Sequence, residues 1–375
     1  MSKVTVTPCG SYEAAEVRAA LIRALEPLGG LSFVQPGMRI GLKANLVAPK
    51  SYHSGAVTHP VLLAELTRLI RERGGEIVIG DSPGGPFTAA YLRSVYLPAG
   101  LSLAEKAGAK LNLDTHLCTA DFPAGAVLKQ ITYTGWLADC DAVITCAKLK
   151  THAMLGMTGA VKNQFGIVPG LMKPEYHALY PKMQDFCNML LDLNEFIKPR
   201  LALIDGVTGM EGNGPTAGTA RQVGCLIASD SVYHADVAMA HIMGLTPGDM
   251  PLIHTAHQRG LGPETLDELT LCGDIAPFVK QDYRNLDIGG VSFGGREDSV
   301  LSQLVRGFLM RRPKVHPAAC VGCGLCAKNC PAHAIHMDRA PKFDYTKCIR
   351  CFCCQEMCPR EAISVKTTFL SRFLN

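Results

Sequence analysis

Short apolar runs alternate with helical patterns along the first 300 or so residues of the chain. Residues 38–46 and 76–81 each place a short apolar run between polar residues, which is typical of a buried strand. Between them, residues 60–73 repeat apolar side chains at helical spacing, beginning at a proline and ending before Gly74. The pattern predicts a strand, a helix and a second strand in this order.

The same alternation continues towards the C-terminus. It predicts strands at 141–150, 200–206 and 223–229, and helices at 182–197 and 230–245. Helices of this length between strands are crossover connections, which join parallel strands. We therefore expect an α/β fold, a mostly parallel sheet with helices on both faces. Residues 262–298, rich in Gly and Asp, are expected either to pack on this sheet or to lie between domains.

Two cysteine runs close the chain. "CVGCGLCAKNCP" (320–331) and "CIRCFCCQEMCP" (348–359) share the spacing Cys-x2-Cys-x2-Cys-x3-Cys-Pro. Three cysteines of such a run ligate one [4Fe–4S] cluster and the fourth ligates the other, so the two runs complete each other. Cluster site I is assigned to Cys320, Cys323, Cys326 and Cys358, and cluster site II to Cys348, Cys351, Cys354 and Cys330.

A pair of structural zinc sites is the alternative interpretation of these runs. Zinc ribbons use two Cys-x2-Cys pairs and need neither a third cysteine nor a Cys-Pro, so the spacing favours clusters. Cys353 is an additional thiol in the second run, which we interpret as unligated, with a shifted ligand register as the alternative. Residues 334–338 and 341–345 are predicted to form two short strands around a turn. The runs resemble bacterial two-cluster ferredoxins, which are small α+β domains.

The boundary of this module is predicted near "FLMRRPKVHP" (308–317), where a helical pattern gives way to basic residues and two prolines. We divide the chain into an α/β domain at 1–312 and a ferredoxin domain with a short tail at 313–375.

Composition excludes several classes of function. The chain is 47% hydrophobic and 19% charged, with a formal charge of +4, which gives no argument for binding nucleic acid or an anionic membrane. Nine of the 16 cysteines lie in the terminal module, and the others show no pairing pattern, which suits a reducing compartment. Neither a signal peptide nor a run of 18 apolar residues is present. We expect a soluble cytoplasmic protein, and exposed clusters favour an anaerobic setting.

Polar residues follow the carboxyl ends of the predicted strands. These ends meet at one edge of a parallel sheet, where loops bind ligands. Turn-forming polar residues are common at any strand end, but four loops that carry charged residues together favour a real site. The candidates are Lys43, Asn45, Asp81, Lys148, Lys150, His152, Asp205 and Glu211.

Residues 149–170, "LKTHAMLGMTGAVKNQFGIVPG", are the densest of these segments. Their glycines let the backbone approach a ligand, and Lys150, His152 and Lys162 are candidates to hold an anion or move protons. Asn163 in the same segment and His177 beyond it are further candidates. The chain has neither a Walker loop nor a Rossmann fingerprint, so neither a P-loop nucleotidase nor an NAD enzyme is expected.

Five motifs together carry a family resemblance: "GLKANL", "THP", "IGDSPGG", "LKTHAMLGMTGAVKNQFG" and "DGVTGMEGNGP" before the cysteine runs. With them, nearly the whole chain resembles the iron–sulfur proteins called domain of unknown function 362. A more distant resemblance links it to the nickel-pincer lactate racemases. It implies that His152, Gly159 and Lys162 match a His, a glycine-rich run and a cofactor-attaching Lys, and that His177 matches a nickel ligand. An additional metal or organic cofactor in the α/β domain is the corresponding expectation.

Paired [4Fe–4S] clusters transfer single electrons, whereas racemisation needs no net electrons. The leading hypothesis is therefore an iron–sulfur oxidoreductase that receives electrons from a redox partner protein and passes them to a small anionic substrate or cofactor. In this hypothesis lysines 43, 148, 150 and 162 hold the anion, with Asn45 and Asn163 beside them, and His152 or His177 supplies protons. Asp81, Asp205 and Glu211 orient those groups or bind a metal.

Two other functions remain open on the sequence. One is a nickel-pincer-type racemase or isomerase whose clusters maintain the redox state of its cofactor. The other is a ferredoxin-type electron carrier or assembly partner without catalytic activity, since a fold does not fix a function.

Overall fold

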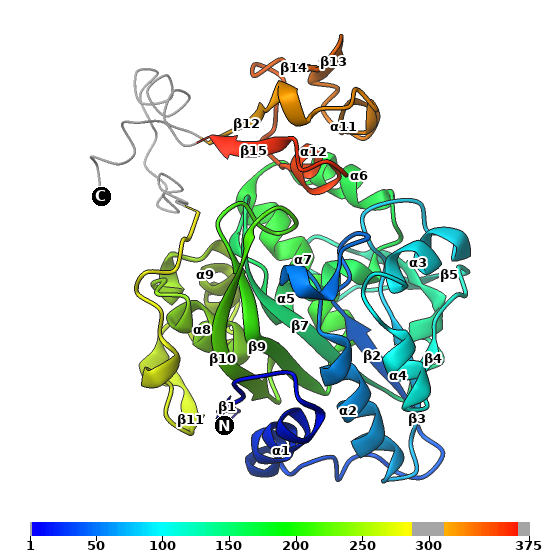
Figure 1. The fold of residues 1–375 in the computed structure, drawn as a ribbon, viewed down its shortest axis with the longest axis vertical. Coiled ribbons are helices and arrows are strands. Elements are labelled where there is room, and N and C mark those ends of the chain that lie inside the picture. Colours follow the sequence, from blue (N-terminus) through cyan, green and yellow to red (C-terminus); the bar gives the residue numbers. More distant parts are fainter. Residues whose placement is uncertain (1, 287–310, 367–375) are drawn as a thin grey trace.

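The computed structural model describes residues 2–286 and 311–366, which form an α/β body and a small C-terminal module (Figure 1). The predicted tail at 367–375 and the second part of the 262–298 segment lie outside the described residues.

The body is built on one sheet. Among the described residues, nine strands belong to it, in the order β11-β1-β10-β9-β7-β2-β3-β4, with β8 paired to β7 off this path. The strands are β1 (Lys3–Pro8), β2 (Arg39–Ala44), β3 (Glu76–Gly80), β4 (Lys110–Leu111), β7 (Ala142–His152), β8 (Gly156–Met157), β9 (Leu201–Glu211), β10 (Thr219–Ser229) and β11 (Thr270–Cys272).

Neighbouring strands from β4 to β9 are parallel, as are β1 and β11. Strand β10 is antiparallel to both β9 and β1. The predicted α/β class with a mostly parallel sheet is thus confirmed, and all five predicted strands are present. The described part of the 262–298 segment packs on the sheet edge as β11.

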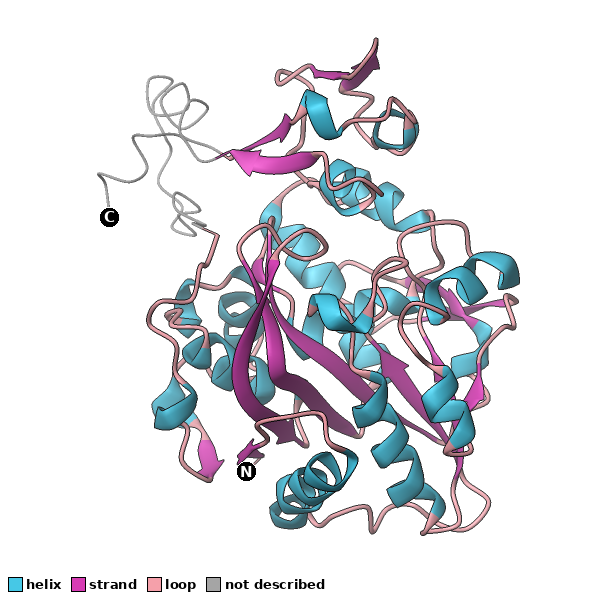
Figure 2. Cartoon of the chain, viewed as in Figure 1, coloured by secondary structure: helices cyan, strands magenta, loops and turns pink. Residues whose placement is uncertain are grey.

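Helices cover both faces of this sheet (Figure 2). Residues of α1, α2, α3 and α4 belong to the apolar cluster on one face, and those of α5, α7, α8 and α9 belong to the cluster on the other. The body's helices are α1 (Ala14–Leu25), α2 (Pro60–Arg71), α3 (Ala89–Tyr96), α4 (Ser102–Lys106), α5 (Gly159–Asn163), α6 (Met172–Leu179), α7 (Met183–Ile197), α8 (Val232–Ile242) and α9 (Pro251–Gln258). A two-stranded sheet of β5 (Leu117–Asp121) and β6 (Gln130–Thr134) lies apart from the main sheet.

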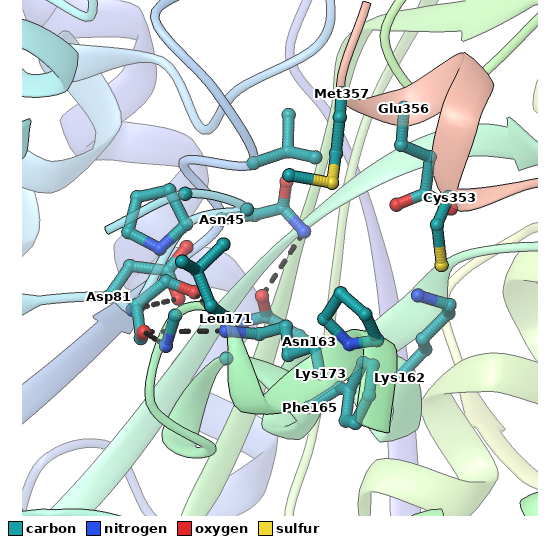
Figure 3. A pocket seen from close by; sticks show the side chains of 18 of the residues that line it. Asn45, Asp81, Lys162, Asn163, Phe165, Leu171, Lys173, Cys353, Glu356 and Met357 are labelled. Carbon is teal, nitrogen blue, oxygen red and sulfur yellow. Dashed lines mark hydrogen bonds between the residues drawn. The ribbon is translucent and has the colours of Figure 1, made fainter. Parts of the chain in front are cut away.

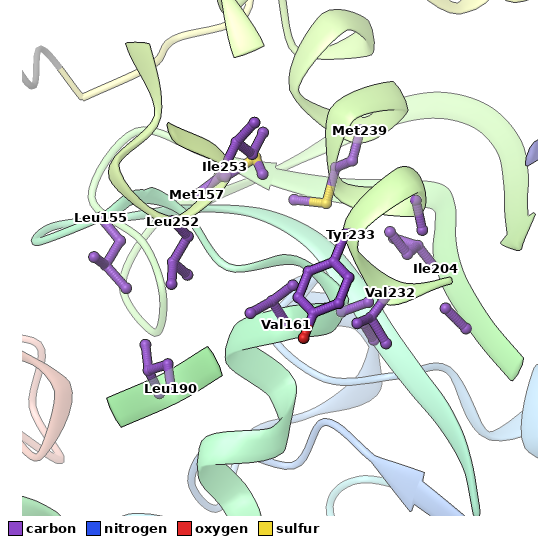
Figure 4. Close-up of a cluster of buried hydrophobic side chains, with 14 of the residues drawn as sticks. Leu155, Met157, Val161, Leu190, Ile204, Val232, Tyr233, Met239, Leu252 and Ile253 are labelled. Carbon is purple, nitrogen blue, oxygen red and sulfur yellow. The ribbon is translucent and has the colours of Figure 1, made fainter. Parts of the chain in front are cut away.

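Successive residues of a strand supply opposite faces of the sheet. In β9, Leu203 belongs to the core that packs on α1 and α2, whereas Ile204 belongs to the core on α7 and α8. Figure 4 shows Ile204 in that second core together with Val161, Leu190 and Tyr233. The apolar runs of the sequence are continuous because the central strands are buried on both sides.

The C-terminal module consists of two small sheets and two short helices. They are β12 (Arg312–Val315) paired with β15 (Ile363–Lys366), β13 (Ile335–Met337) paired with β14 (Pro341–Phe343), α11 (Leu325–Lys328) and α12 (Cys353–Glu356). The two strands predicted around a turn at 334–345 are confirmed. The basic segment at the predicted boundary forms β12 and pairs within this module.

The module docks on the body through polar contacts at the end of β9 and around it. Nε2 of the buried Gln355 donates hydrogen bonds to the carbonyl oxygens of Asn213 (2.9 Å) and Gly214 (3.1 Å). The Val365 amide donates to Oδ1 of Asn213, and Lys50 forms an ion pair with Glu361. These bonds come from Gln355 of α12, from Glu361 in the segment that follows it and from β15, so they fix the module in one orientation.

Helix α5 carries Lys162 and Asn163, and a buried carboxylate fixes its start. Asp236 of α8 accepts hydrogen bonds from the backbone amides of Ala160 (2.5 Å) and Val161 (3.1 Å). Burial raises the pKa of Asp236 to about 7, although these two bonds oppose the shift. Gly159 has a φ of 75°, and a Cβ there would lie 2.4 Å from the Asp236 carboxylate. Only glycine fits this position.

We expect Gly159→Ala to destabilise the protein by about 3 kcal/mol, because left-handed backbone strain adds to the displacement of Asp236. Gly260 provides the matched control, since its φ is also positive (68°) but its surroundings are open. Gly260→Ala should cost about 1 kcal/mol, the strain alone. Urea unfolding of both variants measures the difference, and equal losses would show that the contact with Asp236 is unimportant.

Candidate functional site

A cavity with about 720 Å³ of open space lies between the body and helix α12. We call it the interdomain pocket. Its lining from the body is Lys43, Asn45, Val47, Asp81, Ser82, Pro83, Gly84, Gly85, Lys162, Asn163, Phe165, Gly166, Gly170, Leu171, Lys173, Pro174 and His177, and from the module Cys353, Glu356 and Met357. Figure 3 shows Cys353 and Glu356 reaching from α12 towards Lys162. Six of the predicted site residues therefore meet in one cavity.

Lys43, at the end of β2, forms a buried ion pair with Asp81, at the end of β3. Nζ of Lys43 lies 2.7 Å from Oδ1 of Asp81 and also donates to the Ala44 carbonyl at 2.8 Å. Burial lowers the pKa of Lys43, and the charge of Asp81 opposes this. A Cβ on Gly166 would lie 2.1 Å from Oδ1 of Asp81, so glycine is needed where the loop passes the pair. The charge of Lys43 is therefore balanced by Asp81, and its side chain forms a fixed part of the pocket wall.

Two amides connect this ion pair to the next strand. Oδ1 of Asn163 accepts hydrogen bonds from Nζ of Lys43 (3.2 Å) and Nδ2 of Asn45 (3.1 Å). Nδ2 of Asn163 donates to the Lys43 carbonyl (3.0 Å) and to Oγ1 of Thr145 (2.8 Å). Both Oδ1 and Nδ2 of Asn163 are thus used in hydrogen bonds within the protein, so this side chain holds the pocket wall together.

Lys162 and Lys173 bring the positive charge of the pocket. Nζ of Lys162 lies 5.4 Å from the centre of the Phe165 ring. Nζ of Lys173 donates to the carbonyls of Ser82 and Val168, both at 2.7 Å. Burial lowers the pKa of Lys173 to about 7; Asp81 opposes this shift, and the charges of Lys43 and Lys162 add to it. Lys173 was not among the predicted site residues, although it follows Gly170, the last residue of the glycine-rich segment, by only three positions.

Glu356 of α12 faces His152 at the end of β7. Oε1 of Glu356 lies 3.0 Å from Nε2 of His152, whose Nδ1 accepts hydrogen bonds from the amides of Met154 and Leu155, both at 3.1 Å. The ring therefore carries its proton on Nε2. Burial, together with Lys162, lowers the pKa of His152 to about 4 although Glu356 opposes it. Burial alone would raise the pKa of Glu356, but Lys162 and His152 together lower it to about 2. A charged carboxylate thus lines the pocket next to a neutral histidine.

His177 of α6 lines the pocket with an unused nitrogen. Its ring stacks on Phe186 at 4.3 Å, and burial lowers its pKa to about 3. Its Nδ1 is buried and has no hydrogen-bond partner in the part of the chain that the structure describes. A buried polar atom without a partner is costly, so this nitrogen is available to a ligand.

Five predicted residues do not line the pocket. Nζ of Lys148 lies 2.7 Å from Oδ2 of Asp205 in a fully buried pair that also includes the Tyr12 hydroxyl. Lys150 donates to Oδ1 of Asn45 (2.8 Å) and to the Ala56 carbonyl, behind the pocket wall. His152 contacts the pocket through Glu356, as described above. Glu211 pairs with Arg284 elsewhere on the body, at 2.7 Å.

The predicted acidic residues form separate contacts. Asp81 pairs with Lys43, Asp205 with Lys148, and Glu211 with Arg284. Over residues 2–286 and 311–366, no group of three or more His, Cys, Asp or Glu side chains converges on the position of a single metal ion. These acids therefore orient lysines rather than share a metal.

The assignment of individual cysteines to cluster sites I and II stays a prediction. The four cysteines of cluster site I line one cavity. In cluster site II, burial raises the pKa of Cys354, and the charges of Cys351, Cys348 and Cys330, and of Cys326 from cluster site I, add to the shift. The amides of Ala362 and Ala334 donate to Sγ of Cys358 and Cys330, both at 3.3 Å. The two crossing cysteines thus have equivalent surroundings, as two matched [4Fe–4S] sites require.

Cys353 occupies a different position from the eight assigned ligands. It is buried at the start of α12 and lines the interdomain pocket. Its neighbours Cys351 and Cys354 belong to cluster site II. Its thiol also hydrogen-bonds that of Cys351, so Cys353 lies between the pocket and cluster site II.

Two family descriptions match separate parts of the chain. The family described as domain of unknown function (DUF362) matches residues 40–241, and the 4Fe–4S dicluster domain matches residues 319–366. A thylakoid-associated protein of Synechocystis sp. is 35% identical over 277 residues, which cover 72% of this chain and 83% of that protein. The predicted family resemblance and the ferredoxin-type module that binds 4Fe–4S clusters are confirmed.

A solved structure, the lactate racemase apoprotein from Thermoanaerobacterium thermosaccharolyticum, is similar at 13% identity and a TM-score of 0.36. The match covers 59% of this chain and 54% of that one. None of the helices in the described ranges combines the length and the apolar character needed to cross a bilayer.

We predict that Cys353→Ser keeps the full iron content, because its thiol faces the pocket. Cys354→Ser, one residue on, should lose about half of the iron, because it removes a ligand of cluster site II. Iron analysis and electron paramagnetic resonance of anaerobically purified protein distinguish the two. Iron loss from Cys353→Ser with retention in Cys354→Ser would establish the shifted register instead.

Proposed function

The chain belongs to the family described as domain of unknown function (DUF362), and from this premise we propose that it is an iron–sulfur oxidoreductase acting on a small anionic substrate or cofactor. The observation that supports this most is that the body and the module both line the interdomain pocket. Lysines of the body form one side, and α12, which contains Cys354 of cluster site II, forms the other. A molecule in the pocket would contact the peptide segment that holds a cluster.

Charge in the pocket supports an anionic occupant. Lys43 is neutralised by Asp81, which leaves Lys162 and Lys173 facing the single carboxylate of Glu356. Lys162 and Lys173 would bind the anionic group, and Glu356 would repel it and so set the orientation of the occupant. Asn45, Asn163 and Lys43 would hold the wall against which it rests.

Proton transfer would fall to Lys173 and His177 rather than to His152. Nδ1 of His152 already accepts two hydrogen bonds, its Nε2 lies 3.0 Å from Oε1 of Glu356 without hydrogen-bond geometry, and His152 itself does not line the pocket. Lys173 has a pKa of about 7, which suits a group that must both donate and accept a proton near neutral pH. Nδ1 of His177 would hydrogen-bond the occupant. When bound, [4Fe–4S] clusters supply or accept the single electrons that such a reduction needs.

The setting we propose is the reducing cytoplasm. All 16 cysteines are free, including the seven outside the module. A redox partner protein would exchange electrons with the cluster sites, and neither nucleic acid nor a membrane is part of the proposal.

A racemase-type isomerase is the second candidate, supported by the meeting of Lys162 and His177 in one pocket. These two residues would hold a metal-bearing organic cofactor. Nickel in the purified protein and added mass on Lys162 would favour this candidate over the oxidoreductase.

The oxidoreductase proposal predicts that a pocket anion reoxidises the reduced clusters. Protein reduced with dithionite under anaerobic conditions is mixed with a panel of small acids and anionic cofactors, and cluster absorbance is followed. Lys162→Ala should raise the half-saturating concentration of the active anion about tenfold or more, because one charged hydrogen bond is lost. Lys110→Ala, on the exposed strand β4, is the control and should leave it unchanged. Clusters that stay reduced with every anion would instead indicate a simple electron carrier.

Affinity for that anion should depend on pH through Lys173. Its charged form binds the anion, so affinity is full below the pKa of about 7 and falls as the pH rises through it. Lys173→Met should bind more weakly and lose this pH dependence. Titration calorimetry from pH 6 to 9 provides the measurement, and an unchanged pH profile in Lys173→Met would rule out the assignment.

A further inference from the structure

The two cluster sites have different surroundings. Cluster site II adjoins the interdomain pocket through Cys353 and Glu356. Cluster site I opens on the surface, where Cys323 is exposed and the side chains around it are apolar: Val321 is 62% exposed and Leu325 is 39% exposed. Single exposed apolar side chains are common on any surface, but two of them beside the exposed Cys323 give this redox site an apolar centre of the kind found at protein interfaces.

Basic residues surround this apolar surface. Pro359 and Arg360 line the same cavity as the four cysteines of cluster site I. Lys328 ends the helix that Leu325 begins, and the carbonyl of Arg339 lies 3.5 Å from the position a Cβ would have on Gly322. We define the site I rim as Val321, Leu325, Lys328, Arg339, Pro359 and Arg360. Leu325, Lys328 and Pro359 also line a cleft against the body, so a partner at the rim would contact the edge of that cleft.

The positive charge of the site I rim is not balanced within the module. Residues 311–366 contain ten Lys and Arg but four Asp and Glu. Three of these four acids already lie next to a lysine: Asp338 next to Lys342, Asp344 next to Lys347, and Glu361 next to Lys50. The fourth, Glu356, faces the body and lies next to the neutral His152.

Within the described residues, Lys328, Arg339 and Arg360 form no ion pair with a carboxylate. All three are exposed. Bound clusters would offset part of the module's positive charge. The side chains of Lys328, Arg339 and Arg360 would still be exposed to an approaching partner.

We propose that the site I rim is the docking surface of an acidic one-electron carrier protein of ferredoxin type. An apolar centre with a charged border suits a small, transient redox interface, and opposite charge steers the encounter. In each encounter the carrier loses one electron and this protein gains one, with no bond made or broken. The direction of flow, from the rim through both cluster sites to the interdomain pocket, depends on the proposed function, whereas the docking does not.

The test uses the holoprotein and a reduced acidic two-cluster ferredoxin as the probe. Stopped-flow absorbance gives the second-order rate constant of electron transfer, and thermophoresis of the oxidised pair gives the dissociation constant, both over a range of salt concentrations. The double variant Lys328→Glu/Arg360→Glu should react at least about tenfold more slowly at low salt, with the difference shrinking at high salt. Lys106→Glu/Lys110→Glu makes the same charge change on the body and should match the unmodified protein.

Equal rates and affinities for both double variants would overturn the proposal. So would equally tight binding of a basic c-type cytochrome, which tests the sign of the charge. Iron content and the cluster resonance signals of each variant show that it is folded and loaded. The probe reduces the protein without any pocket anion, so loss of pocket-dependent reoxidation with normal docking would count against the proposed function alone.

Discussion

Helix α12 has only four residues, so its own hydrogen bonds cannot fix its position, and contacts with the body must do so. The most informative of these is the pairing of Glu356 with His152. Two backbone amides donate to Nδ1 of the imidazole, and Nε2 lies 3.0 Å from Oε1 of Glu356. Together with the hydrogen bonds of Gln355 to Asn213 and Gly214, this contact holds α12 against the body, where Cys353 and Glu356 line the interdomain pocket.

The same pairing has an electrostatic consequence. A carboxylate facing Lys162 lowers the cost of keeping that ammonium group in a largely enclosed space, and His152 stays neutral beside it. The pocket is complete only when the module is docked, because three of its lining residues come from the module. Helix α12 would therefore serve both electron delivery, through Cys354, and substrate binding, through Glu356.

Much of the fold was predictable because buried parallel strands leave strong apolar runs. Strands β2, β3, β7 and β9 lie within one or a few residues of the predicted segments. The direction of β10 was not predictable, since an antiparallel neighbour leaves the same apolar run as a parallel one. The pairing of β1 and β11 at the sheet edge involves short strands whose sequence pattern is weak.

The candidate site was predictable where a residue lies at the end of a strand. Lys43 near the end of β2 and Asp81 directly after β3 meet in this way across neighbouring strands. It was not predictable within β7, whose residues 148, 150 and 152 share one face at two-residue spacing but each reach a different neighbour. Glu356 was hidden inside a cysteine run whose spacing already had an explanation. Only the packing of the module on the body shows that this carboxylate belongs to the pocket.

The central claim is that cluster site II is loaded next to the interdomain pocket. Anaerobic crystals of the holoprotein, with anomalous diffraction recorded at the iron edge, test it most directly. The account predicts four iron positions enclosed by Cys348, Cys351, Cys354 and Cys330, with Glu356 against His152 and Cys353 free of metal. Iron bound to Cys353, or a module turned away so that Glu356 no longer lines the pocket, would contradict it.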